Sequence, residues 1–383
     1  MDDIRRVQLG DIAELITKGT TPTTLGYGFQ DEGINFLKIE CFDENGGLIP
    51  EKVAFISDEC NEKLRRSQLK AGDVLFSIAG AIGRVAIVTD EMLPANTNQA
   101  LAIIRISDGD VYLPYIKLIL TSPIVKKQFE KKKQGVAQLN LSLKDINEIL
   151  IPLPDKNKQI EYAGLFEKLY EVIELRNTQI SDLDILTKAR FVEMFGDRYI
   201  NDRKWSTVLL GDSISFNNGK AHEQVVDEDG EYILVTSRAI ASDFTDIRRT
   251  NARLFPLHKD DIVMVMSDVP NGRALAKCQL INEDNKYTLN QRICSFDSYS
   301  FNPVFLLYLL NRHQYFLDFN DGNGQTNLRK NDILGCTLIV PPLGLQAQFA
   351  SFVKQVDKSK VAVQAALDEA QLLFDSLMQQ YFG

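Results

Sequence analysis

The sequence is poor in the residues that metal sites and disulfide frameworks need. It contains 3 histidines and 5 cysteines among 383 residues, and no two cysteines form a C-x-x-C pair. No histidine pair has H-E-x-x-H spacing, so we expect no metal site and no histidine-based catalytic triad. An odd, unpatterned set of cysteines is unsuited to a disulfide framework. We therefore expect free thiols in a reducing, cytoplasmic compartment.

Long apolar runs and cofactor motifs are also missing. The longest apolar runs, such as 149–153, are far shorter than the roughly 18–20 residues of a membrane span. The first residues, MDDIRRVQLGD, contain two acids and no apolar segment typical of a secretory signal. A P-loop, a dinucleotide-binding glycine motif and the amino-methyltransferase motif are absent. The sequence therefore predicts no membrane association, no cofactor and no active site.

The composition is that of a folded protein with a modest negative charge. Hydrophobic residues make up 44% and charged residues 25%, and the formal net charge is −9. The length is sufficient for two to three domains, at roughly 100–200 residues each. No long segment is basic overall, so a DNA-binding face would have to be a local patch.

An internal duplication is the strongest signal in the sequence. Residues 135–146 read GVAQLNLSLKDI and residues 322–333 read GNGQTNLRKNDI, with identical residues at six positions that are 187 residues apart. Other landmarks also recur in order: Leu9-Gly10-Asp11 with Leu210-Gly211-Asp212, Asn98-Gln99 with Asn290-Gln291, Gln159 with Gln346, and Phe195-Gly196 with Phe382-Gly383. The chain thus consists of two similar copies with different loops.

Each copy ends in a predicted long helix, over 154–196 and 344–383. Apolar residues recur there at helical spacing, and prolines stand just before each helix. A 40-residue helix is about 60 Å long and cannot bury its own apolar stripe. We predict that the two pack together as a coiled coil, although each could instead lie on its own domain. The predicted contact residues are Leu169, Ile173, Ile180, Leu183, Val356, Val363, Leu367, Phe374 and Leu377.

The two remaining blocks, 1–153 and 197–343, are predicted to be β-rich with some helix. Short runs of β-branched and apolar residues alternate with glycine-containing turns. The predicted strands are 35–40, 74–78, 85–88, 100–106, 232–236, 262–266 and 292–295, and the predicted helices are 113–133 and 303–312. We therefore predict an α+β fold with two similar β-rich domains separated by two long helices.

Basic and amide side chains suggest where nucleic acid could bind. Lysine suits phosphate contacts, whereas arginine and amides can also read base edges. For each residue alone, a solvated surface role is the alternative, and for Asn140 and Asn327 we favour a backbone cap or turn. Arg248, Arg249 and Arg253 have a spacing that would share one helix or loop face. The other candidates are Arg65, Arg66, Arg84, Lys126, Lys127, Lys131, Lys132, Lys133, Gln138, Arg238, Arg273, Gln325 and Arg329.

Taken together, these features resemble the specificity subunits of type I restriction–modification systems. The resemblance spans the chain and includes the L-G-D openings, the K-G-T-T-P loop at 18–22, the G-D-V-L-F strand at 72–76, and the paired G-x-x-Q-x-N-L elements. It implies that Lys18, Thr20 and Thr21 contact DNA, and it extends this role to Lys220. The second copy departs from the family there, because NNGKA at 217–221 replaces the G-T-T-P stretch.

The resemblance also implies a fold and a set of partners. Two target recognition domains with pseudo-twofold symmetry would be separated by antiparallel helices, and each would read half of a split, asymmetric site in double-stranded DNA. The helices would fix the spacing of the half-sites and dock two copies of the methyltransferase subunit, to which restriction subunits add. The chain itself would not be an enzyme. Two alternatives stay open: a stand-alone duplicated DNA-binding regulator, and a helical scaffold that binds no DNA.

Overall fold

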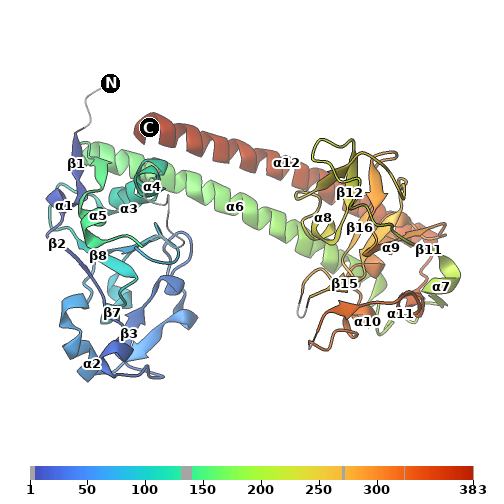
Figure 1. The fold of residues 1–383 in the computed structure, drawn as a ribbon, viewed down its shortest axis with the longest axis horizontal. Helices are drawn as coiled ribbons and strands as arrows, with labels where there is room; N and C mark the ends of the chain where they lie inside the picture. The colour runs from blue at the N-terminus through green and yellow to red at the C-terminus, as the bar shows by residue number, and fades with distance from the viewer. Residues whose placement is uncertain (1–4, 131–139, 270–271, 323, 383) are drawn as a thin grey trace. The chain divides into compact units, whose positions relative to one another are not determined.

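A computed structural model of the chain describes residues 5–130, 140–269, 272–322 and 324–382 (Figure 1). The chain forms two compact units, which we describe separately. Unit 1 comprises 1–177 together with 365–383, and unit 2 comprises 178–364. Each unit therefore contains one of the β-rich blocks, the beginning of the helix that follows it, and the end of the other long helix.

Unit 1 is built on three small sheets. A four-stranded antiparallel sheet has the order β2-β8-β5-β6, and a three-stranded sheet has the order β4-β3-β7, in which β3 and β7 are parallel. The third sheet pairs β1 with β9, just before the long helix begins. The strands are β1 (Arg6–Gln8), β2 (Leu15–Lys18), β3 (Ile34–Leu37), β4 (Ala54–Ile56), β5 (Val74–Ser77), β6 (Val85–Ile87), β7 (Ala95–Thr97), β8 (Leu101–Arg105) and β9 (Leu150–Pro152).

Short helices cover these sheets and enclose the core of unit 1. Helix α3 carries the fully buried Tyr115 and Ile116, which belong to the same apolar cluster as Phe76 of β5. The helices are α1 (Leu9–Ile12), α2 (Asp58–Lys63), α3 (Leu113–Thr121), α4 (Pro123–Glu130) and α5 (Leu143–Asn147). Short 3₁₀ turns are η1 (Pro22–Leu25), η2 (Ile39–Cys41), η3 (Pro50–Lys52), η4 (Arg65–Ser67) and η5 (Asp90–Met92).

Unit 2 repeats this topology. Its four-stranded sheet has the order β11-β18-β14-β16, its three-stranded sheet has the order β13-β12-β17 with β12 and β17 parallel, and β10 pairs with β20. The strands are β10 (Thr207–Leu209), β11 (Ser215–Asn218), β12 (Tyr232–Val235), β13 (Arg248–Thr250), β14 (Ile262–Val265), β16 (Cys278–Leu280), β17 (Tyr287–Leu289), β18 (Ile293–Asp297) and β20 (Thr337–Ile339). An additional short pair joins β15 (Ser267–Asp268) to β19 (Thr326–Asn327). The short helices are α7 (Leu210–Ser213), α8 (Ser237–Ala241), α9 (Pro303–Leu310), α10 (Gln314–Leu317) and α11 (Lys330–Leu334).

The long helices are α6 (Lys156–Phe195) and α12 (Leu343–Phe382), each of 40 residues. In unit 1 they meet through aromatic rings: Phe166 lies 5.2 Å from Phe374, and Tyr162 lies 4.5 Å from Tyr381 between ring centroids. The predicted contact residues Leu169, Ile173 and Leu377 pack onto this cluster, and Phe374 is buried in it. The earlier residues of α6 contact the later residues of α12, so the pair is antiparallel.

The same antiparallel arrangement occurs in unit 2. Phe191 of α6 lies 5.3 Å from Phe349 of α12, and Lys360 pairs with Asp184 across the two helices. Among the predicted contact residues here, Val356 is buried, whereas Ile180, Leu183 and Val363 are half-buried. Leu367, on the part of α12 that belongs to unit 1, is also half-buried. The prediction that the two tails pack against each other is confirmed within each unit.

The tail ends are exchanged between the copies. Phe382, at the end of the second tail, contacts Tyr115 of α3 in unit 1 at 6.0 Å. Phe195, at the end of the first tail, contacts Phe305 of α9 in unit 2 at 4.8 Å. The core of each unit is thus completed by an aromatic residue from the other copy. The recurrence of the phenylalanine at both tail ends has a packing explanation.

The other repeated residues also have structural roles. Gln159 is 1% exposed; its side chain accepts a hydrogen bond from the Tyr112 N–H and donates one to the carbonyl of Pro154. Gln346 is likewise 1% exposed and makes the same two bonds, accepting from Asn302 and donating to Pro341. Each glutamine ties the start of a long helix to the start of α3 or α9. A buried amide needs such partners.

The predicted α+β class is confirmed, and each predicted strand region contains an observed strand. The single helix predicted over 113–133 is wrong, because Ser122 ends α3 in an extended conformation and α4 begins at Pro123. Proline disfavours a helical conformation at the residue before it, which explains the break. Across the residues that the structure describes, no helix is long and apolar enough to cross a membrane.

Candidate nucleic-acid interface

In unit 1 the loop after β2 lies directly on the loop after β7. A side chain at Gly19 would place its Cβ 1.9 Å from the carbonyl oxygen of Thr97, so only glycine allows this approach. The side chain of Gln99 accepts hydrogen bonds from the backbone N–H and the hydroxyl of Thr21. The K-G-T-T-P loop and the repeated Asn-Gln pair, far apart in the sequence, therefore form one surface.

Unit 2 has the same construction with different side chains. A Cβ on Gly219 would lie 2.1 Å from the carbonyl oxygen of Asn290. The Lys220 N–H donates to the carbonyl of Leu289, which holds the loop in place. Gln291 donates a hydrogen bond to Glu223 at 3.0 Å. Lys220 thus corresponds in position to Thr20, but the groups presented by the two units differ.

The second repeated element joins each surface through an equivalent backbone bond. The Leu141 N–H donates to Ile78 in unit 1, and the Leu328 N–H donates to Met266 in unit 2. We call residues 18–21, 78–84, 98–100 and 140–141 edge 1, and residues 218–220, 266–268, 290–292 and 325–328 edge 2. Edge 2 contains a hollow of about 290 Å³ whose polar lining consists of Ser267, Gln291, Arg292, Gln325 and Asn327.

Several predicted residues of unit 1 lie at or beside edge 1. Lys18 is exposed at the end of β2, and Arg84 is half-buried in the turn between β5 and β6. Arg65 and Arg66, in η4, line a hollow of about 570 Å³ together with Thr17, the residue before Lys18. Lys18 and Arg84 thus belong to edge 1, whereas Arg65 and Arg66 lie along β2 in a hollow that no residue of edge 1 lines.

The lysine-rich segment of the first copy is described only in part. Lys126 and Lys127 are exposed on α4, whose buried face packs Phe129 against Phe76 at 5.6 Å. Their position on the solvent face leaves both ammonium groups accessible to a phosphate. The predicted residues Lys131, Lys132, Lys133 and Gln138 lie outside the described residues.

The arginine group of unit 2 differs from expectation. Arg248 and Arg249 are adjacent in strand β13 and therefore point to opposite faces, so the expected common helix or loop face is wrong. Arg253 donates to Asn285 at 3.0 Å and lies over the ring of Tyr232. Arg238 is exposed on α8 and belongs to none of the segments that form edge 2. Its Nε lies 3.6 Å from a carboxylate oxygen of Asp246.

The amides of the repeated element need a separate correction. Asn140 and Asn327 do not cap the helices that follow them, because the residues before α5 and α11 are Ser142 and Arg329, and Asn327 lies in β19. The alternative turn role stays a prediction. Both Gln325 and Asn327 are exposed. Arg329 is exposed next to edge 2, while its backbone N–H donates to Asp332 and stabilises the start of α11. The amides of this element are thus available to a ligand.

Gln99 and Gln291 belong to the candidate interface, although the sequence analysis did not select them. Both were recognised only as landmarks of the repeat, although an Asn-Gln pair that recurs in two otherwise different blocks was a usable signal. Their location depends on the parallel strands β3 and β7, or β12 and β17, whose pairing no local pattern specifies.

The cysteines of the chain lie in its core. All five cysteines are free and buried, and burial raises the pKa of the Cys336 thiol to about 12. A thiol with a raised pKa is a poor nucleophile. Over the described parts of the chain, no group of three His, Cys, Asp or Glu side chains could hold a metal ion. The fold and the site thus define a class: a duplicated α+β protein that presents two dissimilar polar edges.

The chain belongs to the family of type I restriction modification DNA specificity domains, whose model matches residues 1–184 and 202–370. It is 29% identical over 153 residues to the type I restriction enzyme EcoBI specificity subunit of Escherichia coli, covering 39% of this chain and 31% of that protein. It is 24% identical over 210 residues to the putative type I restriction enzyme MjaX specificity subunit of Methanocaldococcus jannaschii, covering 54% and 48%. The chain thus matches about half or less of the length of these relatives.

Solved structures share the fold. A chain from a structure concerned with complex assembly and conformational transition of the type I R-M system matches with a TM-score of 0.64, at 17% identity, over 98% of this chain and 96% of its own. The type I restriction-modification system S subunit from M. genitalium matches with a TM-score of 0.54, at 14% identity, over 100% and 97%.

Proposed function

We propose that the chain is the DNA-specificity subunit of a type I restriction–modification complex. Edge 1 and edge 2 would each read one half of a split, asymmetric site in double-stranded DNA. The observation that supports this proposal is the repeated construction of the edges: the same loops converge in both units, but the side chains there are Thr21 and Gln99 in one, and Lys220 and Gln291 in the other. One frame with two sets of donors and acceptors suits two different half-sites.

We propose that the long helices dock the partner subunits. Large apolar side chains remain exposed on both: Leu175 is 55% exposed, Ile185 59%, Val361 71% and Leu372 71%. Apolar residues that a folded chain leaves exposed in this number commonly mark a protein interface. Two copies of the methyltransferase subunit would bind there, and restriction subunits would add to them. Adenine methylation and ATP-dependent cleavage would belong to these partners, and the chain itself would contribute recognition.

Methylome sequencing tests the proposal directly. Cells that contain the methyltransferase subunit are compared with and without this chain, and we expect a split adenine-methylated motif only when the chain is present. Gln99→Ala should relax the sequence requirement in one half of the motif and Gln291→Ala in the other, because each amide belongs to a different edge. Asn282→Ala, an exposed amide after β16 that belongs to neither edge and to neither long helix, is the matched control and should leave the motif intact. An identical methylated motif without the chain would contradict the proposal.

A further inference from the structure

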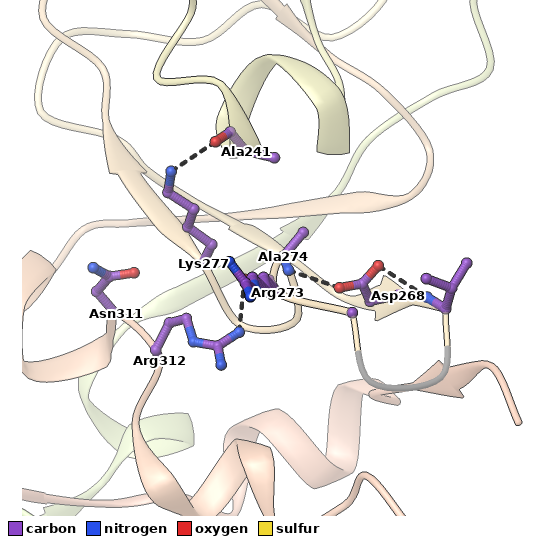
Figure 2. Close-up of a pocket in the computed structure, with 9 residues that line it drawn as sticks. Ala241, Asp268, Arg273, Ala274, Lys277, Asn311 and Arg312 are labelled. Carbon is purple, nitrogen blue, oxygen red and sulfur yellow. Dashed lines mark hydrogen bonds between the residues drawn. The ribbon is translucent and has the colours of Figure 1, made fainter. Parts of the chain in front are cut away.

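A second hollow, of about 450 Å³, is lined in part by Asp268 of edge 2 (Figure 2). Ser267, which lines the hollow at edge 2, and Asp268, which lines the second hollow, are consecutive residues of strand β15. Lys277 and Arg312 were not among the residues predicted to bind DNA, yet both line this second hollow with Arg273. Three of its nine lining residues are thus basic, and one is acidic.

The acidic residue of the hollow is already engaged. Asp268 accepts hydrogen bonds from three backbone N–H groups of the turn that follows it: those of Val269, Ala274 and Leu275, at 2.8, 2.7 and 3.1 Å. These bonds engage both oxygens of the carboxylate, and Figure 2 shows the bond from Ala274 as a dashed line. Asp268 is therefore occupied by backbone hydrogen bonds. The basic side chains line the same hollow.

Arg312 is held in an unusual conformation that orients its guanidinium. Its φ of 51° is in the left-handed region, which non-glycine residues adopt at an energetic cost. The Arg312 N–H donates to Ala276 at 2.8 Å, and Arg198 donates to the Arg312 carbonyl at 3.1 Å, so neighbouring groups enforce this conformation. The Nη1 group then donates to the carbonyls of Arg273 and Leu275 at 2.7 and 3.3 Å.

This arrangement leaves donors available on a fixed group. Arginine has five N–H donors, and among the described residues no partner contacts Nε or Nη2 of Arg312. Arg273 is exposed beside it. Lys277 is less available, because its ammonium donates to Ala241 and pairs with Asp243, both at 2.9 Å. Two guanidinium groups around one hollow match the oxygens of a phosphate.

The first copy has basic groups at the corresponding place in the chain. In the second copy, Arg312 comes shortly after α9. In the first copy, α4, which carries Lys126 and Lys127, comes shortly after α3. α3 and α9 begin at equivalent positions, each fixed by the buried glutamine of a long helix. Both copies thus carry basic residues after this equivalent helix, although the residues differ.

We propose that this hollow is a phosphate seat, in which Arg312 and Arg273 bind one backbone phosphate of the DNA strand that crosses edge 2. The inference rests on the proposed function and adds a contact that grips the DNA without reading its sequence. A phosphate contact carries no base information, so it contributes affinity and salt dependence.

The test measures DNA binding by the chain in complex with its methyltransferase subunit, as a function of potassium chloride concentration, by fluorescence anisotropy. Arg312→Gln should weaken binding about tenfold at low salt and lower the slope of log K against log salt by about 0.9, the contribution of one phosphate. The methylated motif should stay the same. Lys259→Gln is the matched control: Lys259 is exposed and precedes β14, whereas the hollow follows the other end of that strand.

A second variant, Arg273→Gln, and a second ligand, inorganic phosphate, distinguish the possible reasons for an altered binding result. If thermal unfolding shows that Arg312→Gln does not fold, Arg273→Gln carries the test, because its exposed side chain is not needed for the turn. Unchanged affinity and unchanged slope in a folded variant would overturn the phosphate seat. Altered inhibition by inorganic phosphate without altered DNA binding would overturn it too, since the hollow would then hold free phosphate. Absence of specific binding by the wild-type complex would instead refute the proposed function.

Discussion

Gly19→Ala should damage recognition at edge 1 while leaving edge 2 intact. The added Cβ would lie 1.9 Å from the carbonyl oxygen of Thr97 and 2.5 Å from that of Asn98. Both are backbone atoms that cannot rotate away, and ordinary contact begins near 3.4 Å. The loop must therefore shift by roughly 1.5 Å, and overpacking of this kind costs about 1–3 kcal/mol.

The shift has a direct consequence for DNA reading. The hydrogen bond from the Thr21 N–H to Gln99 is 3.1 Å long, and a displacement of this size breaks it. A well-placed base contact contributes about 1–3 kcal/mol of discrimination, so specific binding should weaken about 10- to 100-fold. The chain should still fold, because a loss of about 1–3 kcal/mol is smaller than the roughly 5–15 kcal/mol by which folded proteins are usually stable.

The assay combines affinity with the methylated motif. DNA binding by the chain with its methyltransferase subunit gives the loss of affinity, and methylome sequencing shows which half of the motif is relaxed. Gly28→Ala is the matched control, since an added Cβ there meets no atom within 4 Å. If Gly19→Ala binds like wild type, or relaxes both halves of the motif equally, the loops are not the reading surface of unit 1.

The remaining predictions concern stability and spacing. Arg105→Met removes both 2.7 Å hydrogen bonds to the fully buried Asp73. The free energy of unfolding, measured by urea titration, should fall by about 3–5 kcal/mol. Adding Asp73→Asn to this variant should restore part of the loss, because the unpaired buried charge is removed. Burial raises the pKa of Asp261 above 3.8, so the folded state binds the proton more readily and stability should fall as pH rises from about 4 through the raised pKa. Asp261→Asn should flatten that profile, and an unchanged slope in urea titrations from pH 4 to 7 would contradict this cause. Inserting four residues after Leu175 lengthens α6 by about 6 Å. The number of base pairs between the two halves of the methylated motif should then change by about two. An unchanged number would show that the helices do not set this spacing.

Much of the fold was accessible from the sequence because it depends on local periodicity. Alternating short apolar runs between glycine turns predicted the strands around Val74–Ser77 and Ile262–Val265, and steps of three and four predicted the two 40-residue helices. The break at Ser122 escaped because the apolar pattern continues past it, while the proline at 123 changes the backbone. The six-residue identity between 135–146 and 322–333 predicted two copies of one frame.

The candidate site was less accessible, because its parts are distant in the sequence. Thr21 and Gln99 are 78 residues apart, and no spacing rule predicts that their loops meet. Arg312 shows the same limit: its role depends on a left-handed backbone imposed by Arg198 and Ala276, and a lone arginine after a helix does not predict this. The lysine-rich run in the first copy was visible in the sequence, because its charges are contiguous.

The sequence by itself determined the duplication, the order of strands and helices, and the need of each long helix for a partner, because these follow from patterns within a few turns of chain. Only the tertiary structure decided that each tail ends in the core of the other copy's unit, through Phe195 and Phe382, and that two loops and an amide segment converge at each edge. The physical reason is that an apolar stripe specifies a surface to be buried, whereas the choice among possible partners depends on packing and backbone hydrogen bonds between distant segments.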